Sequence, residues 1–153
     1  MTMGNAMNQS AEEEFTNYLG VSLSISSMEL PPDRITQIVG IEPSWDRVRG
    51  ALTRQGVRRR PQFDLHEWQY REQLDVKPTD YIGDHSEKFI TEFLNKFKDA
   101  TPRVKELSEH HNVLISLVYQ VRYIPYLGLT GQHVQDIAAL GASLDYDLMV
   151  DGL

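Results

Sequence analysis

Two aspartates near the end of the chain, Asp145 and Asp147, are separated by a single residue. Acidic pairs of this kind hold divalent cations in sugar and phosphoryl transferases. On one strand face the two carboxylates lie about 7 Å apart, so one ion needs a further oxygen ligand, for which Asp151 and Ser24 are the candidates. The interpretation that we favour is a solvated strand face whose charges discourage pairing at a sheet edge. We therefore predict no metal site.

Histidine and cysteine provide no recognisable catalytic motif. The chain has no Cys, which excludes thiolate catalysis, disulfides, iron–sulfur clusters and sulfur-ligated zinc. His110 and His111 point in diverging directions on a helix and cannot share a metal, and His85 and His133 fall in the first turns of predicted helices. His66 shares the apolar phase of a predicted strand, where we expect a histidine bonded to backbone. No His-Glu-x-x-His or Gly-x-Ser-x-Gly is present, so we predict no catalytic residue and no cofactor.

The segment from Glu42 to Gln62 is the most basic part of the chain. Its arginines are Arg47, Arg49, Arg54, Arg58, Arg59 and Arg60. One interpretation is contact with RNA or phosphate. No aromatic residue lies within this run to stack on bases, although Trp45 lies just outside it. The other interpretation is a solvated loop that pairs with the protein's own carboxylates. The net charge of −7 disfavours nucleic acid and anionic membranes as partners.

Hydrophobic periodicity indicates the elements that position these residues. Apolar and polar side chains alternate in four segments, which predicts strands at about 18–27, 65–73, 113–124 and 143–151. Helices are predicted at 32–39, at 84–97 from the capping-box-like start at Asp84, at 101–110, and at 132–140 after the cap Thr130. Gly40 and Gly141 end the first and the last of these helices as C′ residues. The segment 42–62 is interpreted as a long loop or a loose hairpin.

The order of these elements predicts an α+β fold in a single domain of residues 16–153. Residues 1–15 form a flexible segment, with a short helix from Ser10 to Leu19 as the alternative. Because three of the four strands are half polar, the sheet has one solvated face, which argues against a doubly wound sheet. We predict a four-stranded, mostly antiparallel sheet with helices on one face, ferredoxin-like, with two similar strand–helix–strand halves. This fold requires Phe89, Phe93 and Phe97 to pack on the apolar face of the sheet.

Several short motifs resemble those of a known family. They are Ser22–Ser26 followed by Leu30–Thr36, then Val39–Ser44, Trp68, and the closing stretch Ile137–Asp147. These pieces resemble the bacterial family called domain of unknown function 4279, over about residues 18–151. The family's usual lysine–glycine stands here as Arg49-Gly50. The resemblance implies a fold and no catalytic residues.

Charge and size favour binding over catalysis. Small, acidic, cysteine-free α+β proteins suit inhibitor or immunity roles, in which carboxylates steer a basic partner such as a toxin onto the surface. We predict a non-enzymatic cytoplasmic protein that binds another protein and has no membrane segment. The first alternative is an enzyme, or a small-ligand or metal-binding protein, that uses the polar sheet face; the second is RNA or phosphate binding through the arginines. The predicted partner-binding residues are Asp145, Asp147, Asp151, Glu67, Arg71, Gln120, Arg122 and Tyr126.

Overall fold

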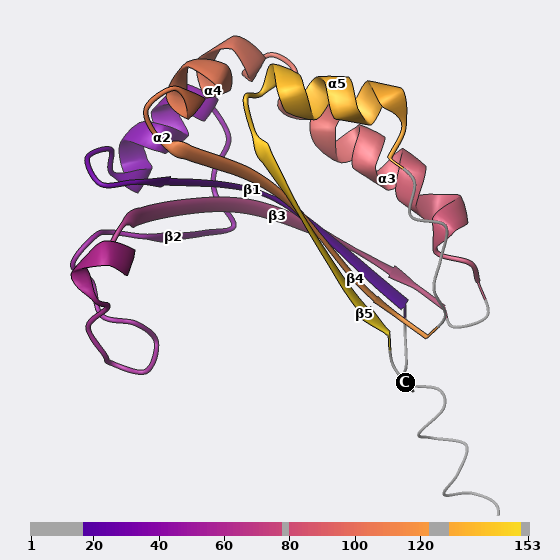
Figure 1. The fold of residues 1–153 in the computed structure, drawn as a ribbon, viewed down its shortest axis with the longest axis horizontal. Helices are drawn as coiled ribbons and strands as arrows, with labels where there is room; N and C mark the ends of the chain where they lie inside the picture. The colour runs from indigo at the N-terminus through magenta and orange to yellow at the C-terminus, as the bar shows by residue number, and fades with distance from the viewer. Residues whose placement is uncertain (1–16, 78–79, 123–128, 151–153) are drawn as a thin grey trace, which may run out of the picture.

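The structure is a computed structural model that describes residues 17–77, 80–122 and 129–150 (Figure 1). Its elements in chain order are β1 (Asn17–Ser27), α2 (Pro32–Val39), β2 (Trp45–Arg47), the 3-10 turn η1 (Pro61–Phe63), β3 (His66–Val76), α3 (Gly83–Asn95), α4 (Thr101–Ser108), β4 (Asn112–Val121), α5 (Gly131–Ala139) and β5 (Ser143–Val150). All four predicted strands and all four predicted helices are present, which confirms the α+β class. The predicted N-terminal segment, with its alternative helix, lies outside the described residues.

The sheet has five strands in the order β2-β3-β1-β4-β5, so the prediction of four strands is wrong. The additional strand, β2, pairs antiparallel with β3 through the register Trp45↔Gln69 to Arg47↔Glu67. Three residues are too few to show an alternating pattern, and only the pairing with β3 makes this segment a strand. The segment predicted as a loop or loose hairpin is therefore a hairpin with a long connection.

The ferredoxin-like pattern is present, but it is formed with the unpredicted strand β2 in place of the predicted strand β5. The strands β2-β3-β1-β4 are antiparallel throughout, with α2 connecting β1 to β2 and the pair α3–α4 connecting β3 to β4. Each connection joins two strands that have a third strand between them, which is the split β-α-β arrangement. The fifth strand, β5, is added parallel to β4 through α5, so the sheet is mixed. The two predicted halves therefore differ in their pairing.

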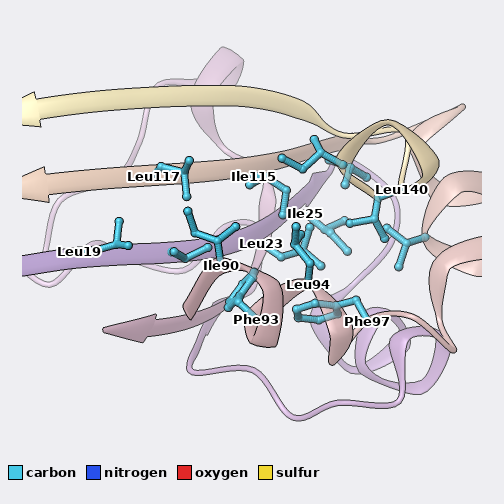
Figure 2. Packing of buried hydrophobic residues seen from close by; sticks show 14 of the residues in the cluster. Leu19, Leu23, Ile25, Ile90, Phe93, Leu94, Phe97, Ile115, Leu117 and Leu140 are labelled. Carbon is cyan, nitrogen blue, oxygen red and sulfur yellow. The ribbon is translucent and has the colours of Figure 1, made fainter. Parts of the chain in front are cut away.

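All four helices lie over the same face of the sheet (Figure 1). Between the layers, Phe93 and Phe97 are fully buried against Leu23 and Leu117, as predicted, whereas Phe89 is only half-buried (Figure 2). The rings of Phe93 and Phe97 lie 5.3 Å apart in a tilted arrangement that aromatic pairs favour. None of the described helices is long and apolar enough to cross a membrane.

The helix ends test the predicted capping and stop residues. Gly40 (φ 80°) and Gly141 (φ 67°) have the left-handed backbone that was predicted for helix stops. Thr130 accepts a hydrogen bond from the His133 N–H at 3.1 Å, so its prediction as a cap is also confirmed. The capping box predicted at Asp84 is wrong, because the helix begins one residue earlier, after an Ile82 that makes no side-chain cap bond.

Candidate binding face

The sheet face opposite the helices, here called the polar face, carries side chains of opposite charge at its two sides. Its central cross-strand row runs from Arg71 on β3 through Ser22 on β1 and Ser116 on β4 to Asp145 on β5. The next row runs in the same order through Gln73, Gly20, Val118 and Asp147. A cation, small residues and a carboxylate therefore follow one another across the central row.

The middle of the polar face is built from small residues. Gly20 has no side chain, and the Tyr18 hydroxyl and the Arg71 guanidinium lie over it: a Cβ here would be 2.6 Å from Tyr18 Oη and 3.0 Å from Arg71 Nη2. The guanidinium of Arg71 is 5.5 Å from the centre of the Tyr18 ring, within the range of a cation–π contact. Arg71 thus lies along the sheet and remains exposed to solvent.

Asp145 and Asp147 lie on the edge strand β5, and both are exposed. Asp145 Oδ1 accepts the backbone N–H of Tyr146 at 3.0 Å, so part of this carboxylate serves its own strand. Ser24, suggested above as a third metal ligand, is wrongly placed, because β4 separates β1 from β5 by two strand spacings of about 4.8 Å each. Among the described residues no group of three His, Cys, Asp or Glu side chains could hold a metal ion.

The other predicted partner-binding residues occupy different parts of this surface. Glu67 and Arg71 lie on β3, and Gln120 lies on β4 beside Tyr18. Arg122 follows the end of β4 and is exposed. The predicted residues Tyr126 and Asp151 lie outside the described residues.

The basic segment forms a loop of residues 48–60, here called the arginine loop, whose base is fixed by an ion pair between the buried Arg47 and the half-buried Asp64. Arg47 donates to Asp64 at 3.0 Å and to the Leu65 carbonyl at 3.1 Å, while the Gly50 N–H donates to Asp64 at 2.9 Å. The bond from Gly50, opposed by burial and assisted by Arg47, holds the pKa of Asp64 below its usual value. His66 Nδ1 accepts the backbone N–H of Arg49 at 2.9 Å, which confirms a histidine bonded to backbone.

The arginines of this segment divide into three groups. Arg47 and Arg59 pair with Asp64 and Glu67, as expected for a loop that uses the protein's own carboxylates. Arg49 donates to the Met28 carbonyl at 3.4 Å. The remaining three are exposed and make no ion pair within the described part of the chain: Arg54, Arg58 and Arg60.

Two grooves meet at Trp45 and Gln69, which line both of them. The groove beside the arginine loop has a volume of about 840 Å3 and is also lined by Leu52, Arg54 and Arg71. The second, of about 570 Å3, continues across the polar face toward the start of β5. The pairing of β2 with β3 therefore brings Trp45 into one groove with arginines that follow it in the sequence. The sequence placed Trp45 just outside the arginine run and did not predict its place in this groove, because β2 carries no strand signal of its own.

The edge strand β5 leaves large apolar side chains in solvent. Leu144 and Met149 are each 44% exposed and Tyr146 is 36% exposed. The predicted alternation is present, since Leu144 and Tyr146 lie beside the buried Ile115 and Leu117 of β4. They remain exposed because β5 has a neighbour on one side only. The ring of Tyr146 stacks on that of Tyr119 at 5.6 Å.

Comparison with known proteins identifies a family but no activity. No curated protein and no solved structure matches the chain. A family model described as a domain of unknown function, DUF4279, matches residues 14–151. This match covers every strand, the arginine loop and the two carboxylates of β5. The chain therefore belongs to the DUF4279 family.

Proposed function

We propose that this protein acts by binding another protein through its polar face, as a cytoplasmic inhibitor or immunity protein directed at a basic partner. One observation carries the proposal. The polar face lies opposite all four helices (Figure 1), and its edge strand β5 exposes Asp145, Asp147 and Met149 on that face. Exposed apolar side chains rimmed by charged ones are typical of protein interaction sites.

The residue types on this surface suit a protein partner. Tryptophan, tyrosine, methionine and arginine are enriched at the centres of protein interfaces. Trp45, Arg71 and Met149 supply three of these types on the polar face, and all three are exposed. Carboxylates beside such anchors favour a partner with a basic surface.

The β5 side of the polar face comes from a part of the sequence without basic residues. Residues 123–153 contain four aspartates and no lysine or arginine. Two of these aspartates, Asp145 and Asp147, are exposed on β5. Exposed carboxylates of one sign raise the rate at which an oppositely charged protein associates, and salt weakens this effect.

The chemistry of the grooves favours binding over a reaction. Side chains with a shifted pKa are candidates for catalytic groups. Here burial raises the pKa of Tyr119 and Tyr146 and lowers that of His133, and these residues belong to the helix-facing side. Asp64, whose pKa is lowered, serves the base of the arginine loop.

The test begins with identification of a partner by affinity purification of the full chain from its native cells. The complex is then reconstituted from two purified proteins, and its association rate is measured at low and high salt. We expect Asp145→Asn with Asp147→Asn to slow association about threefold to tenfold at low salt and to flatten the salt dependence. The matched control removes two exposed carboxylates of the helical side, Glu106→Gln with Glu109→Gln, and leaves the rate unchanged.

Three outcomes would contradict the proposal. Failure to reconstitute a binary complex would remove the protein-binding function. An unchanged rate in the Asp145→Asn and Asp147→Asn variant, with binding abolished by Arg58→Ala and Arg60→Ala, would move the site to the arginine loop. A metabolite or metal ion that purifies with the chain and is displaced by Gln69→Ala would favour the ligand-binding alternative.

A further inference from the structure

The central row of the polar face is complementary to the same row read in the opposite order. From β3 to β5 it reads Arg71, Ser22, Ser116 and Asp145. Read from the other end, the same row places a carboxylate opposite the arginine and a serine opposite each serine. A two-fold axis that runs between β1 and β4, nearly parallel to the strands, produces this superposition in a second copy. Self-complementarity of this kind is what a two-fold interface requires.

The neighbouring rows are compatible with the same axis. The row of Gln73, Gly20, Val118 and Asp147 places an amide opposite the second carboxylate and the glycine opposite Val118. The two central positions of both rows are small or medium-sized, and the Tyr18 hydroxyl and the Arg71 guanidinium that lie over Gly20 form part of the contact surface. No pair of like charges meets in either row, so neither row opposes the contact electrostatically.

The arginine loop extends the contact beyond the sheet. It continues from β2, the strand that lies outside β3, so the same axis places it and Trp45 next to the edge strand β5 of the second copy. Its exposed apolar side chains include Val48, Leu52 and Val57, each more than half exposed. Exposed apolar and acidic side chains of β5 would then meet exposed apolar and basic side chains of the loop.

The size of this surface also suits a dimer. Four strand spacings of about 4.8 Å and eight residues of about 3.3 Å give the sheet alone a flat area of about 500 Å2. The arginine loop adds further surface. A stable interface uses about 800 Å2 on each partner, which the face and the loop together approach.

We propose that the occupant of the polar face is a second copy of this chain, in a two-fold dimer that pairs Arg71 of each copy with Asp145 of the other. The proposal does not depend on the function proposed above. A partner protein would compete with the second copy for the same face, whereas the dimer is measured on this chain alone. Each proposal can therefore fail separately.

The test is sedimentation equilibrium of the full chain at concentrations up to about 1 mM, at low and high salt. We expect a concentration-dependent dimer that salt weakens. Arg71→Glu and Asp145→Arg, each alone, lower the association constant about tenfold or more, because each places like charges together twice in the dimer. The matched controls, Lys98→Glu and Glu109→Arg, reverse exposed charges on the helical side and leave association unchanged.

The decisive measurement is restoration of the pair. An equimolar mixture of the two reversed variants, and also the double variant, regains the dimer because each contact again joins opposite charges. Circular dichroism checks folding, and the milder Arg71→Gln and Asp145→Asn replace any reversal that does not fold. Trp45 gives an independent signal, since it is 36% exposed while the other tryptophan, Trp68, is fully buried. Its emission shifts to shorter wavelength as the dimer forms.

Three results would overturn the dimer proposal. The first is a chain that stays monomeric at about 1 mM, because a weaker contact has no use as an interface. The second is a dimer that both reversals leave intact, which would place the interface elsewhere. The third is loss of the dimer in each single variant without recovery in the mixture, which would reject the pairing across a two-fold axis.

Discussion

His133 is the buried titratable group whose environment makes the sharpest prediction about stability. Its side chain is 1% exposed, and its Nδ1 accepts the backbone N–H of Thr130 at 3.2 Å. Its Nε2 lies 2.7 Å from Thr91 Oγ1, whose hydroxyl donates to the Glu87 carbonyl at 2.9 Å. These partners fit the neutral ring with its proton on Nε2, because Nδ1 must remain an acceptor. Protonation would make Nδ1 a donor that faces the Thr130 N–H, so this hydrogen bond and the capping box would be lost.

The sign of the pH dependence follows from this environment. Burial, opposed by the charges of Glu87 and Asp136, lowers the pKa of His133 in the folded protein below its ordinary value near 6.5. Below that value the unfolded chain binds a proton that the folded chain does not. The contribution of His133 to the free energy of unfolding is therefore fully present above about pH 6.5, and it falls as the pH decreases toward the pKa of the folded protein. The slope from this group is at most about 1.4 kcal/mol per pH unit.

Two substitutions separate the titration from the packing. His133→Ala leaves the Thr130 N–H without its acceptor, and loss of the cap with an unpaired buried donor costs about 2–4 kcal/mol at pH 8. His133→Asn keeps an acceptor oxygen near the position of Nδ1 and does not titrate, so it should cost about 1–2 kcal/mol. In both variants the stability difference from wild type should narrow as the pH falls from 7 to 5.

The measurement is urea unfolding of wild type and both variants between pH 5 and pH 8. The other histidines are shared by all three proteins, so the difference between wild type and His133→Asn reports His133 alone. A stability difference that stays constant over this range would refute the assignment of a buried neutral imidazole. Equal losses for the two substitutions at pH 8 would refute the role of Nδ1 as the acceptor.

The core and the loops give three further predictions. Phe93→Ala should lower the free energy of unfolding by about 3–5 kcal/mol in urea titrations, because the ring is fully buried between the helices and the sheet. Gly141→Ala should destabilise more than Gly40→Ala in the same titrations: both require the left-handed backbone, at about 1–2 kcal/mol, but a Cβ at Gly141 would also lie 2.1 Å from the Ser108 hydroxyl oxygen. Arg47→Met should make trypsin cut the arginine loop faster while circular dichroism stays unchanged, and an unchanged cleavage rate would show that the Arg47–Asp64 ion pair does not hold the loop.

Much of the fold follows from short-range patterns in the sequence. An alternating run such as that of β1 assigns each side chain to one of two faces, and a glycine such as Gly40 ends a helix through its own backbone. These features depend on neighbours within a few residues, so they could be predicted correctly. The start of α3 at Gly83 could not, because the spacing of Asp84 and Glu87 fits a capping box with a later start, and such a signal locates a helix end only to within one or two residues.

The sequence by itself determined which residues lie on the polar face and which form the core, because alternation within a strand fixes the face of every side chain. It did not determine which strands are neighbours. Only the tertiary structure made a strand of Trp45–Arg47, placed Arg71 and Asp145 in one row, and left β5 at the edge of the sheet. The physical reason is that pairing depends on long-range packing between segments far apart in the chain. Alternation within one strand does not specify which other strand pairs with it. The candidate binding face is a product of that pairing.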